Sequence, residues 1–266
     1  NFGRISGMSA KKYTGLEAEL YDLFRGGDDF DEIGYYVDLA LNRGGNCLDV
    51  GCGTGRVLIP IAQQGIKITG LDNSSDMIEE CRKRLSSEGI AVDLIEEDMT
   101  NFNYENNFDL IIIPGGSFQL LDERDDALEA LKNFRKYLEP EGLFVMSLFT
   151  PFYEISHEFL DGVWRLDKDE KIEGSENRAL CHSCVDLDRC ENLMEVRHRF
   201  ELINNDGITE SSEIKFSRLR WYGKYEIQLL LERAGFEHVK ISGDFENDDM
   251  RDGHTVMSIS AAPVSI

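Results

Sequence analysis

The sequence is poor in basic residues, in cysteine and in long apolar runs, and each shortage excludes a class of protein. Lysine and arginine together number 28 against 51 aspartates and glutamates, which gives a formal net charge of −23 at pH 7. Such a charge repels phosphate backbones and anionic lipids, so neither nucleic acid nor a membrane surface is an expected partner. Small neutral or cationic ligands suit the chain better.

Apolar stretches are too short to cross a membrane. The longest uncharged apolar run, 110–121, is shorter than a membrane helix and contains Pro114-Gly115-Gly116. The N-terminus shows no apolar signal core, and residues 1–7, which precede Met8, are left out of the fold prediction. Six scattered cysteines do not suggest a disulfide framework, so a cytoplasmic location is expected.

What the sequence does have is a glycine-rich turn between an expected strand and an expected helix. The short apolar run Cys47–Val50 contains one acid, Asp49, and is followed by Gly51, Gly53 and Gly55. This order is typical of the nucleotide-binding opening of a doubly wound α/β sheet. Glycine lets the backbone turn tightly and approach a ligand that a Cβ atom would block.

A second acid, Asp72, follows the next expected strand, Ile66–Leu71. A carboxylate at this point can accept hydrogen bonds from two ribose hydroxyls. A nicotinamide oxidoreductase would share these features, but the glycines are spaced G-x-G-x-G and lack the third glycine of the dinucleotide fingerprint. Asp49 would also repel a pyrophosphate, whereas it would attract a methionyl ammonium beside a sulfonium.

Four short segments stand in a distinctive order: Leu48–Arg56, Asp72–Met77, Glu97–Met99 and Phe108–Ile113. Together they resemble the motifs of class I S-adenosylmethionine-dependent methyltransferases, and the resemblance runs from roughly Glu17 to the C-terminus. It implies S-adenosyl-L-methionine as the cofactor and S-adenosyl-L-homocysteine as the product. The cofactor-binding residues that it implies are Tyr21, Asp49, Gly51, Cys52, Gly53, Gly55, Arg56, Asp72, Asn73, Met77, Asp98, Met99 and Pro114.

The resemblance also implies how these residues divide the cofactor among them. Asp49 and the glycine loop would hold the methionyl part and Asp72 the ribose. Asp98 would accept from the adenine amino group, or it simply caps a loop. Met77 would pack on the adenine, or it is plain core. Arg56 would open the helix after the loop and assist through a carboxylate contact.

The predicted fold class is α/β, with a doubly wound seven-stranded Rossmann-like sheet, an N-terminal helical lid and an inserted antiparallel β-sheet. The expected divisions are a lid at 11–45, the cofactor-binding core at 46–150, the inserted substrate or dimer region at 151–222, and a C-terminal helix and strand pair at 223–266. The insertion is expected to hold about three strands, at 178–186, 192–203 and 209–219, because these stretches alternate or are β-rich. Asp206-Gly207 is a hairpin signal between two of them.

Two segments of the expected lid have helical apolar spacing, Leu16–Phe24 and Ile33–Leu41. A pair of helices that merely caps the sheet is the first interpretation, and a lid that closes over the cofactor is the alternative. Glu19–Asp22 resembles the lid of bacterial amino-sugar N,N-dimethyltransferases, which implies that the Tyr21 hydroxyl lies near the cofactor carboxylate, with Tyr13 a weaker candidate. In amino-sugar and glycine N-methyltransferases an added sheet roofs the active site or makes a dimer, so a homodimer through the insertion is expected.

The loop after Ile113 points to a small-molecule acceptor. Many DNA and protein amide methyltransferases carry an Asn/Asp-Pro-Pro-aromatic motif here, whereas Pro114-Gly115-Gly116 lacks the amide and the second proline. N-methylation of an amine is favoured over O-methylation, because an amine can lose its proton to water and needs no dedicated base. A catalytically silent S-adenosylmethionine-binding or dimerising module remains a further alternative.

Candidates for chemistry outside the cofactor site are few. His157 is the candidate general base, although a surface histidine explains it as well. The residues considered for the substrate site are Phe118, Tyr153, Trp164, Arg220 and Tyr222. The aromatic rings among them would attract a cation or simply form core. No metal site is expected. Cys181 and Cys184 would face opposite sides of a strand and could not share a zinc ion. The acidic run Asp244–Asp249 is interpreted as a solvated loop, because it lacks the spacing of calcium ligands.

Overall fold

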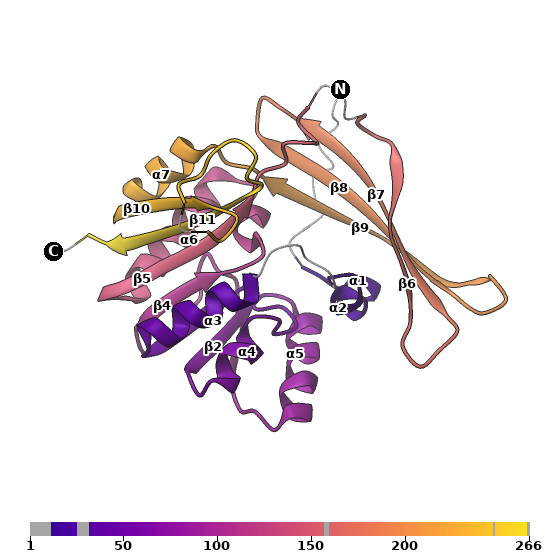
Figure 1. The fold of residues 1–266 in the computed structure, drawn as a ribbon, viewed down its shortest axis with the longest axis horizontal. Helices are drawn as coiled ribbons and strands as arrows, with labels where there is room; N and C mark the ends of the chain where they lie inside the picture. The colour runs from indigo at the N-terminus through magenta and orange to yellow at the C-terminus, as the bar shows by residue number, and fades with distance from the viewer. Residues whose placement is uncertain (1–11, 26–31, 157–159, 247, 265–266) are drawn as a thin grey trace.

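The computed structural model describes residues 12–25, 32–156, 160–246 and 248–264, and a seven-stranded sheet forms its centre (Figure 1). Its strands are β1 (Asn46–Val50), β2 (Lys67–Asp72), β3 (Asp93–Glu96), β4 (Phe108–Ile113), β5 (Leu138–Phe149), β10 (Phe236–Gly243) and β11 (Val256–Pro263). They lie in the order β10-β11-β5-β4-β1-β2-β3. Strand β11 is antiparallel to both of its neighbours, and the other neighbours pair in parallel. The predicted fold class is confirmed.

Strand β4 shows why the parallel strands lie in the interior. Its last four residues, 110–113, are fully buried and apolar. Parallel strands with both faces covered by helices need such a continuous apolar run. The helices are α3 (Glu32–Arg43), α4 (Leu58–Gln63) and α5 (Ser75–Glu88) on one face, and α6 (Arg124–Tyr137) and α7 (Lys224–Arg233) on the other.

Local sequence fixes the ends of α5, which carries a residue of the functional site. The Ser74 hydroxyl accepts a hydrogen bond from the Met77 amide at 3.2 Å and so caps the first turn. At the other end Gly89 adopts φ +68°, the left-handed conformation that ends many helices. Met77 is thereby held in the first turn, directly after the end of β2.

A second sheet of four antiparallel strands follows β5 in the sequence. Its strands are β6 (Trp164–Lys171), β7 (Arg178–Asp188), β8 (Leu193–Ile203) and β9 (Thr209–Arg220), in that spatial order. The sequence predicted about three strands and missed β6. The reason is its composition, W-R-L-D-K-D-E-K: β6 is an edge strand, largely exposed and mostly charged, so it lacks an alternating apolar pattern.

The N-terminal helices lie between the two sheets (Figure 1). The expected single helix over 16–24 is divided into α1 (Leu16–Glu19) and α2 (Tyr21–Phe24), with Leu20 as the cap between them. Leu16 and Leu20 pack with Phe200 and other buried residues of β7 and β8. The four-stranded sheet therefore supports the N-terminal segment from one side.

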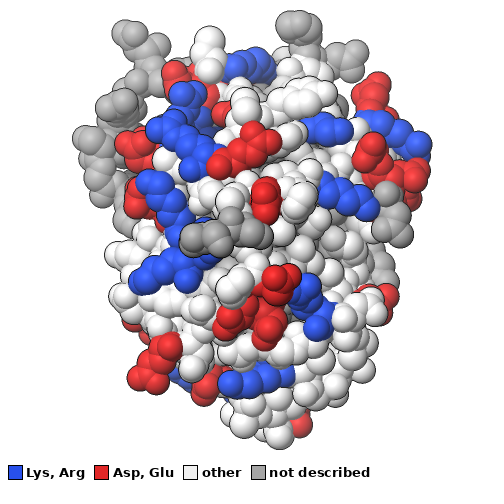
Figure 2. Space-filling model, turned by 90° about the vertical axis from the view of Figure 1, so that its left-hand side faces the viewer, with Lys and Arg blue, Asp and Glu red and all other residues white. Residues whose placement is uncertain are grey.

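Charged side chains of both signs are mixed over the face in Figure 2, so the excess of acid does not gather there into one surface. Within the described ranges, no helix is long and apolar enough to cross a bilayer. A short 3₁₀ helix, η1 (Ser117–Leu120), completes the elements and follows β4.

Candidate functional site

A cavity of about 360 Å³ opens at the carboxyl ends of the parallel strands. The strand order reverses between β1 and β4, and such a switch point is where ligands bind in open α/β sheets. Eight of the residues that the sequence predicted for the cofactor line this cavity: Tyr21, Gly51, Gly53, Asp72, Asn73, Met77, Asp98 and Met99. The other five lie behind the lining or beside it: Asp49, Cys52, Gly55, Arg56 and Pro114.

The glycine loop reaches the cavity because it has no side chains to obstruct it. Gly51 adopts φ +70°, and a Cβ atom there would lie 2.7 Å from the Ser117 side chain. A Cβ atom at Gly53 would meet nothing closer than 3.9 Å, so that position is open toward the cavity that it lines. The loop thus presents bare backbone to a ligand.

Asp72 joins the glycine loop to the end of β2. Its carboxylate accepts hydrogen bonds from the Gly53 amide at 2.9 Å and from the Ser74 amide at 2.8 Å. Burial raises the pKa of Asp72, and these backbone hydrogen bonds act in the opposite direction. Because each carboxylate oxygen has two lone pairs, acceptor capacity remains for the hydroxyls of a ligand.

Asp49 lies beneath the loop with an unsatisfied oxygen. Its side chain is 1% exposed, and its Oδ1 has no hydrogen-bond partner among the described residues. Burial raises the pKa of Asp49 to about 8, the Arg56 guanidinium lowers it, and the carboxylates of Asp72 and Glu32 raise it further. An orphaned acidic oxygen beside an open glycine loop suits a cationic ammonium, so the residues present fit a methionyl group.

Glu32, at the start of α3, was not predicted and lines the cavity. It forms an ion pair with Arg56, and its Oε1 accepts from the Gly115 amide at 2.8 Å and from the Ser147 hydroxyl at 2.9 Å. One carboxylate thereby connects the loops after β1 and β4 with β5. The sequence gave no local signal for this, because a single acid at a helix start is common.

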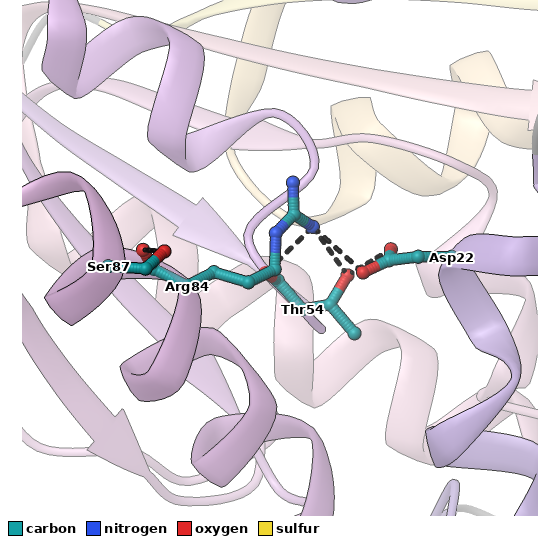
Figure 3. A network of polar contacts seen from close by, with 4 residues as sticks. All are labelled: Asp22, Thr54, Arg84 and Ser87. Carbon is teal, nitrogen blue, oxygen red and sulfur yellow. Dashed lines mark hydrogen bonds and ion pairs between the residues drawn. The ribbon is translucent and has the colours of Figure 1, made fainter. Parts of the chain in front are cut away.

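The N-terminal segment is bonded to the glycine loop by the group shown in Figure 3. The Asp22 carboxylate accepts from the Thr54 hydroxyl at 2.7 Å and pairs with Arg84 of α5 at 3.0 Å. Arg84 also donates to the Thr54 carbonyl at 3.1 Å. We call Asp22, Thr54 and Arg84 the latch, since they fix α2 over the cofactor loop.

Aromatic rings of the N-terminal segment line the same part of the cavity. Tyr13 and Tyr21 meet edge to face with ring centroids 5.7 Å apart, and the Arg25 guanidinium lies 5.3 Å from the Tyr21 ring centroid. Burial is the main cause of a raised pKa for Tyr13, so its phenol stays protonated at neutral pH. Both predicted tyrosines therefore lie at the cavity, and Tyr13 is as well placed as Tyr21.

Asp98 lies at the opposite side of the cavity, after β3. Its Oδ1 accepts from the Thr100 amide at 2.9 Å and the Thr100 hydroxyl at 2.7 Å, while Oδ2 accepts from Asn73 Nδ2 at 3.3 Å. The carboxylate therefore caps its own loop and faces the cavity as well. The loop-capping interpretation agrees with these hydrogen bonds, and the contact with the adenine stays a prediction.

The five residues considered for the substrate site do not line the cavity. Phe118 and Tyr222 are buried and pack together with ring centroids 5.8 Å apart. Arg220 is buried and donates to the carbonyls of Asp122 and Glu191. Tyr153 and Trp164 are exposed at the surface. The prediction that these five form the pocket wall is corrected, and His157 lies outside the described residues.

The cavity wall at the β5 side contains residues that the sequence did not reveal: Ser147, Phe149, Leu219, Phe245 and Val256. Phe149 ends β5, and its partner across the sheet is Val256 of β11. This pairing joins positions far apart in the chain, so no local pattern could have indicated it. Leu219 comes from β9, so the four-stranded sheet contributes to the cavity wall.

Comparison with known proteins agrees with this geometry. Residues 47–142 match the family described as a methyltransferase domain. YqeM of Bacillus subtilis (strain 168), named as a candidate methyltransferase, is 24% identical over 245 residues, which cover 89% of this chain and 91% of the relative. The dTDP-3-amino-3,4,6-trideoxy-alpha-D-glucopyranose N,N-dimethyltransferase of Streptomyces venezuelae is 32% identical over 135 residues, or 48% of this chain and 55% of that protein.

A solved structure shares the whole fold. It is an S-adenosylmethionine-dependent methyltransferase from Clostridium acetobutylicum ATCC 824, which superposes with a TM-score of 0.76 at 18% identity. The superposition covers 93% of this chain and 97% of the other.

Proposed function

This chain carries a class I S-adenosylmethionine-dependent methyltransferase domain, and from that premise we propose that it methylates the nitrogen of a small-molecule amine. The observation that carries the proposal is the cavity of about 360 Å³, a size suited to small ligands. Its lining includes the carboxylates of Glu32, Asp72, Glu97 and Asp98, whereas the basic group among the described residues of the lining is the guanidinium of Arg25. Such a wall favours cationic ligands over anionic ones.

The cofactor would be held by the residues whose geometry fits it. Asp49 and the glycine loop would bind the methionyl end, Asp72 the ribose and Asp98 the adenine. S-adenosylmethionine supplies an activated methyl group: the S–CH₃ bond breaks as the N–CH₃ bond forms, and S-adenosylhomocysteine leaves as a neutral thioether. The chain's own part is to align the acceptor, and the latch holds α2 over the site, which keeps water out.

An amine acceptor requires the least from the residues present. Among the described residues that line the cavity there is neither histidine nor lysine, so a general base for a hydroxyl would have to be one of the carboxylates Glu32, Asp72, Glu97 and Asp98. An amine releases its proton to water before it binds, whereas a hydroxyl needs a positioned base to remove its proton. The Streptomyces venezuelae relative, whose name states N,N-dimethylation of an amino sugar, supports the same choice.

The direct test is methyl transfer from deuterated S-adenosylmethionine into a fractionated metabolite extract, followed by mass spectrometry. We expect a labelled product whose label lies on nitrogen. A label on oxygen would replace the proposal with O-methylation. If no fraction takes up label while calorimetry shows cofactor binding, the domain is a silent binding module instead.

We also propose that the inserted region pairs two copies of the chain. Leu166 of β6 and Ile214 of β9 are about half exposed and share one face, since the register aligns Leu166, His182, Arg199 and Ile214 in one row. Apolar side chains on an exposed sheet face support such a contact. Sedimentation velocity should show a wild-type dimer and a monomeric Leu166→Lys variant. A monomeric wild-type protein would refute the proposed pairing.

A further inference from the structure

The connection between β10 and β11 contains two consecutive residues in an unusual backbone conformation. Asp244 adopts φ +46° and Phe245 adopts φ +62°. Aspartate tolerates the left-handed region, whereas a bulky residue such as phenylalanine is rarely found there. Backbone held in this way persists only where its surroundings enforce it, and such positions cluster at functional sites. The acidic stretch 244–249, expected to be only a solvated loop, thus begins with a constrained turn.

Hydrogen bonds to β11 enforce the turn. The Asp244 Oδ1 atom accepts from the Thr255 amide at 2.9 Å and from the Val256 amide at 2.8 Å. The Asp244 amide donates to the Val256 carbonyl at 2.9 Å, and the Phe245 amide donates to the Ser258 hydroxyl at 3.1 Å. The turn is therefore bonded to the first residues of β11, which fixes the direction of the Phe245 ring.

The side chain is half-buried and packs against α3. It lies 5.3 Å from the Tyr35 ring and 6.3 Å from the Tyr36 ring of α3, measured between centroids, and it lines the cavity. Val256, which lies beside it at the start of β11, also lines the cavity and pairs with Phe149. Phe245 thus closes the cavity between α3 and the ends of β5 and β11.

This closed end is the acceptor end, if the function proposed above holds. Apart from Tyr21 and Pro114, the residues assigned to the cofactor lie at or after the ends of β1, β2 and β3, whereas Phe245 lies beside β5 and β11, on the other side of β4 in the sheet order. The wall there is largely apolar, formed by Phe149, Leu219 and Val256, and the Glu32 carboxylate on the same side is paired with Arg56 and accepts from the Ser147 hydroxyl. An amine with an apolar body matches this combination.

We propose that Phe245 is a specificity-determining residue that sets the size of the acceptor and restricts the site to compact amines. The constrained turn holds a rigid ring as the end wall of the cavity. Removing the ring lengthens the acceptor space without touching Asp49, Asp72 or the glycine loop. The unusual backbone conformation costs free energy, and its result is a ring held as a fixed wall at the reacting end of the cavity.

The test compares three amines of increasing size, methylamine, cyclohexylamine and benzylamine. Their affinities for the complex with S-adenosylhomocysteine are measured by calorimetry for wild type, Phe245→Ala and Phe245→Gly. Both variants should raise the affinity for benzylamine relative to methylamine by at least about tenfold, since a single added or missing methylene in an apolar pocket already changes discrimination by about that factor. Glycine suits φ +62°, so Phe245→Gly separates loss of the ring from backbone strain.

The matched control is Tyr225→Ala, which removes an aromatic ring that is 74% exposed on α7 and should leave the affinities unchanged. The proposal is overturned if folded Phe245 variants keep the wild-type preference, if benzylamine binds to neither variant, or if the cofactor affinity alone falls. Failure of amine methylation is seen separately. In that case the wild-type protein transfers no methyl group to any amine. The ratio of the benzylamine affinity to the methylamine affinity still differs between wild type and the Phe245 variants.

Discussion

At the scale of single residues, Asp49 is an acid whose protonation at neutral pH depends on the fold. The same carboxyl has a pKa of 3.8 when unperturbed and about 8 when buried beneath the glycine loop. Between these values the unfolded chain has released the proton and the folded chain still holds it. The favourable contribution of this group is therefore complete below about pH 4 and is lost as the pH rises to 8.

Asp49→Asn should remove that pH dependence. Asparagine is neutral throughout, so the variant should melt several degrees above wild type at pH 8, and the difference should disappear near pH 4. Affinity for S-adenosylmethionine should fall in the same variant, because the carboxylate that matches the ammonium is gone. Differential scanning calorimetry across this pH range checks the melting temperatures, and a calorimetric titration checks the cofactor affinity. A difference in melting temperature that does not change with pH would contradict the predicted effect on stability.

Asp72→Ala should weaken both the fold and the cofactor affinity. The substitution leaves the amides of Gly53 and Ser74 without their acceptor, which costs about 1–3 kcal/mol for each buried donor. It also removes the acceptor expected for the ribose hydroxyls. Asp93→Ala, at an exposed position of β3, is the control and should change neither quantity. Unchanged cofactor affinity in a folded Asp72→Ala protein would refute the assignment of Asp72.

At the scale of elements, the latch decides how firmly α2 covers the cofactor loop. Asp22→Ala should free this helix, because it removes both the Thr54 hydrogen bond and the Arg84 ion pair. Exposed pairs of this kind contribute about 0.2–1 kcal/mol, so trypsin cleavage after Arg25 should accelerate roughly twofold to fivefold. Glu80→Ala, which removes a comparably exposed pair with Lys83, is the control. Equal cleavage rates would show that the latch does not hold the helix.

Elements with a strong local pattern could be predicted from the sequence. The apolar run of β4 and the capped helix α5 are of this kind, because their signals lie within the segment itself. The charged strand β6 was missed, since its pairing with β7 and not its composition makes it a strand. Eight of the residues assigned to the cofactor line the cavity, because the motifs that carry them are likewise local. Glu32, Ser147 and Phe245 were not predicted, because only the packed tertiary structure brings them to the cavity.

At the scale of the whole molecule, the charge of −23 opposes compaction through self-repulsion. Raising NaCl from about 50 mM to about 500 mM shortens the screening length well below the protein diameter. The melting temperature should therefore rise with salt. A scan of melting temperature against NaCl concentration checks this, and a flat or falling curve would mean that local ion pairs outweigh the net charge.

The buried amide of Gln119 connects the two sheets at their junction. Its Nε2 donates to the carbonyls of Phe149 and Arg220, both at 3.1 Å, and its Oε1 accepts from the Phe149 amide at 2.8 Å. Phe149 and Arg220 are the points where the chain leaves the central sheet and returns from the inserted one. The insertion is thus a loop with its two ends bonded at one spot. A core of this kind can gain, lose or exchange the whole segment during evolution while its own strands keep their register.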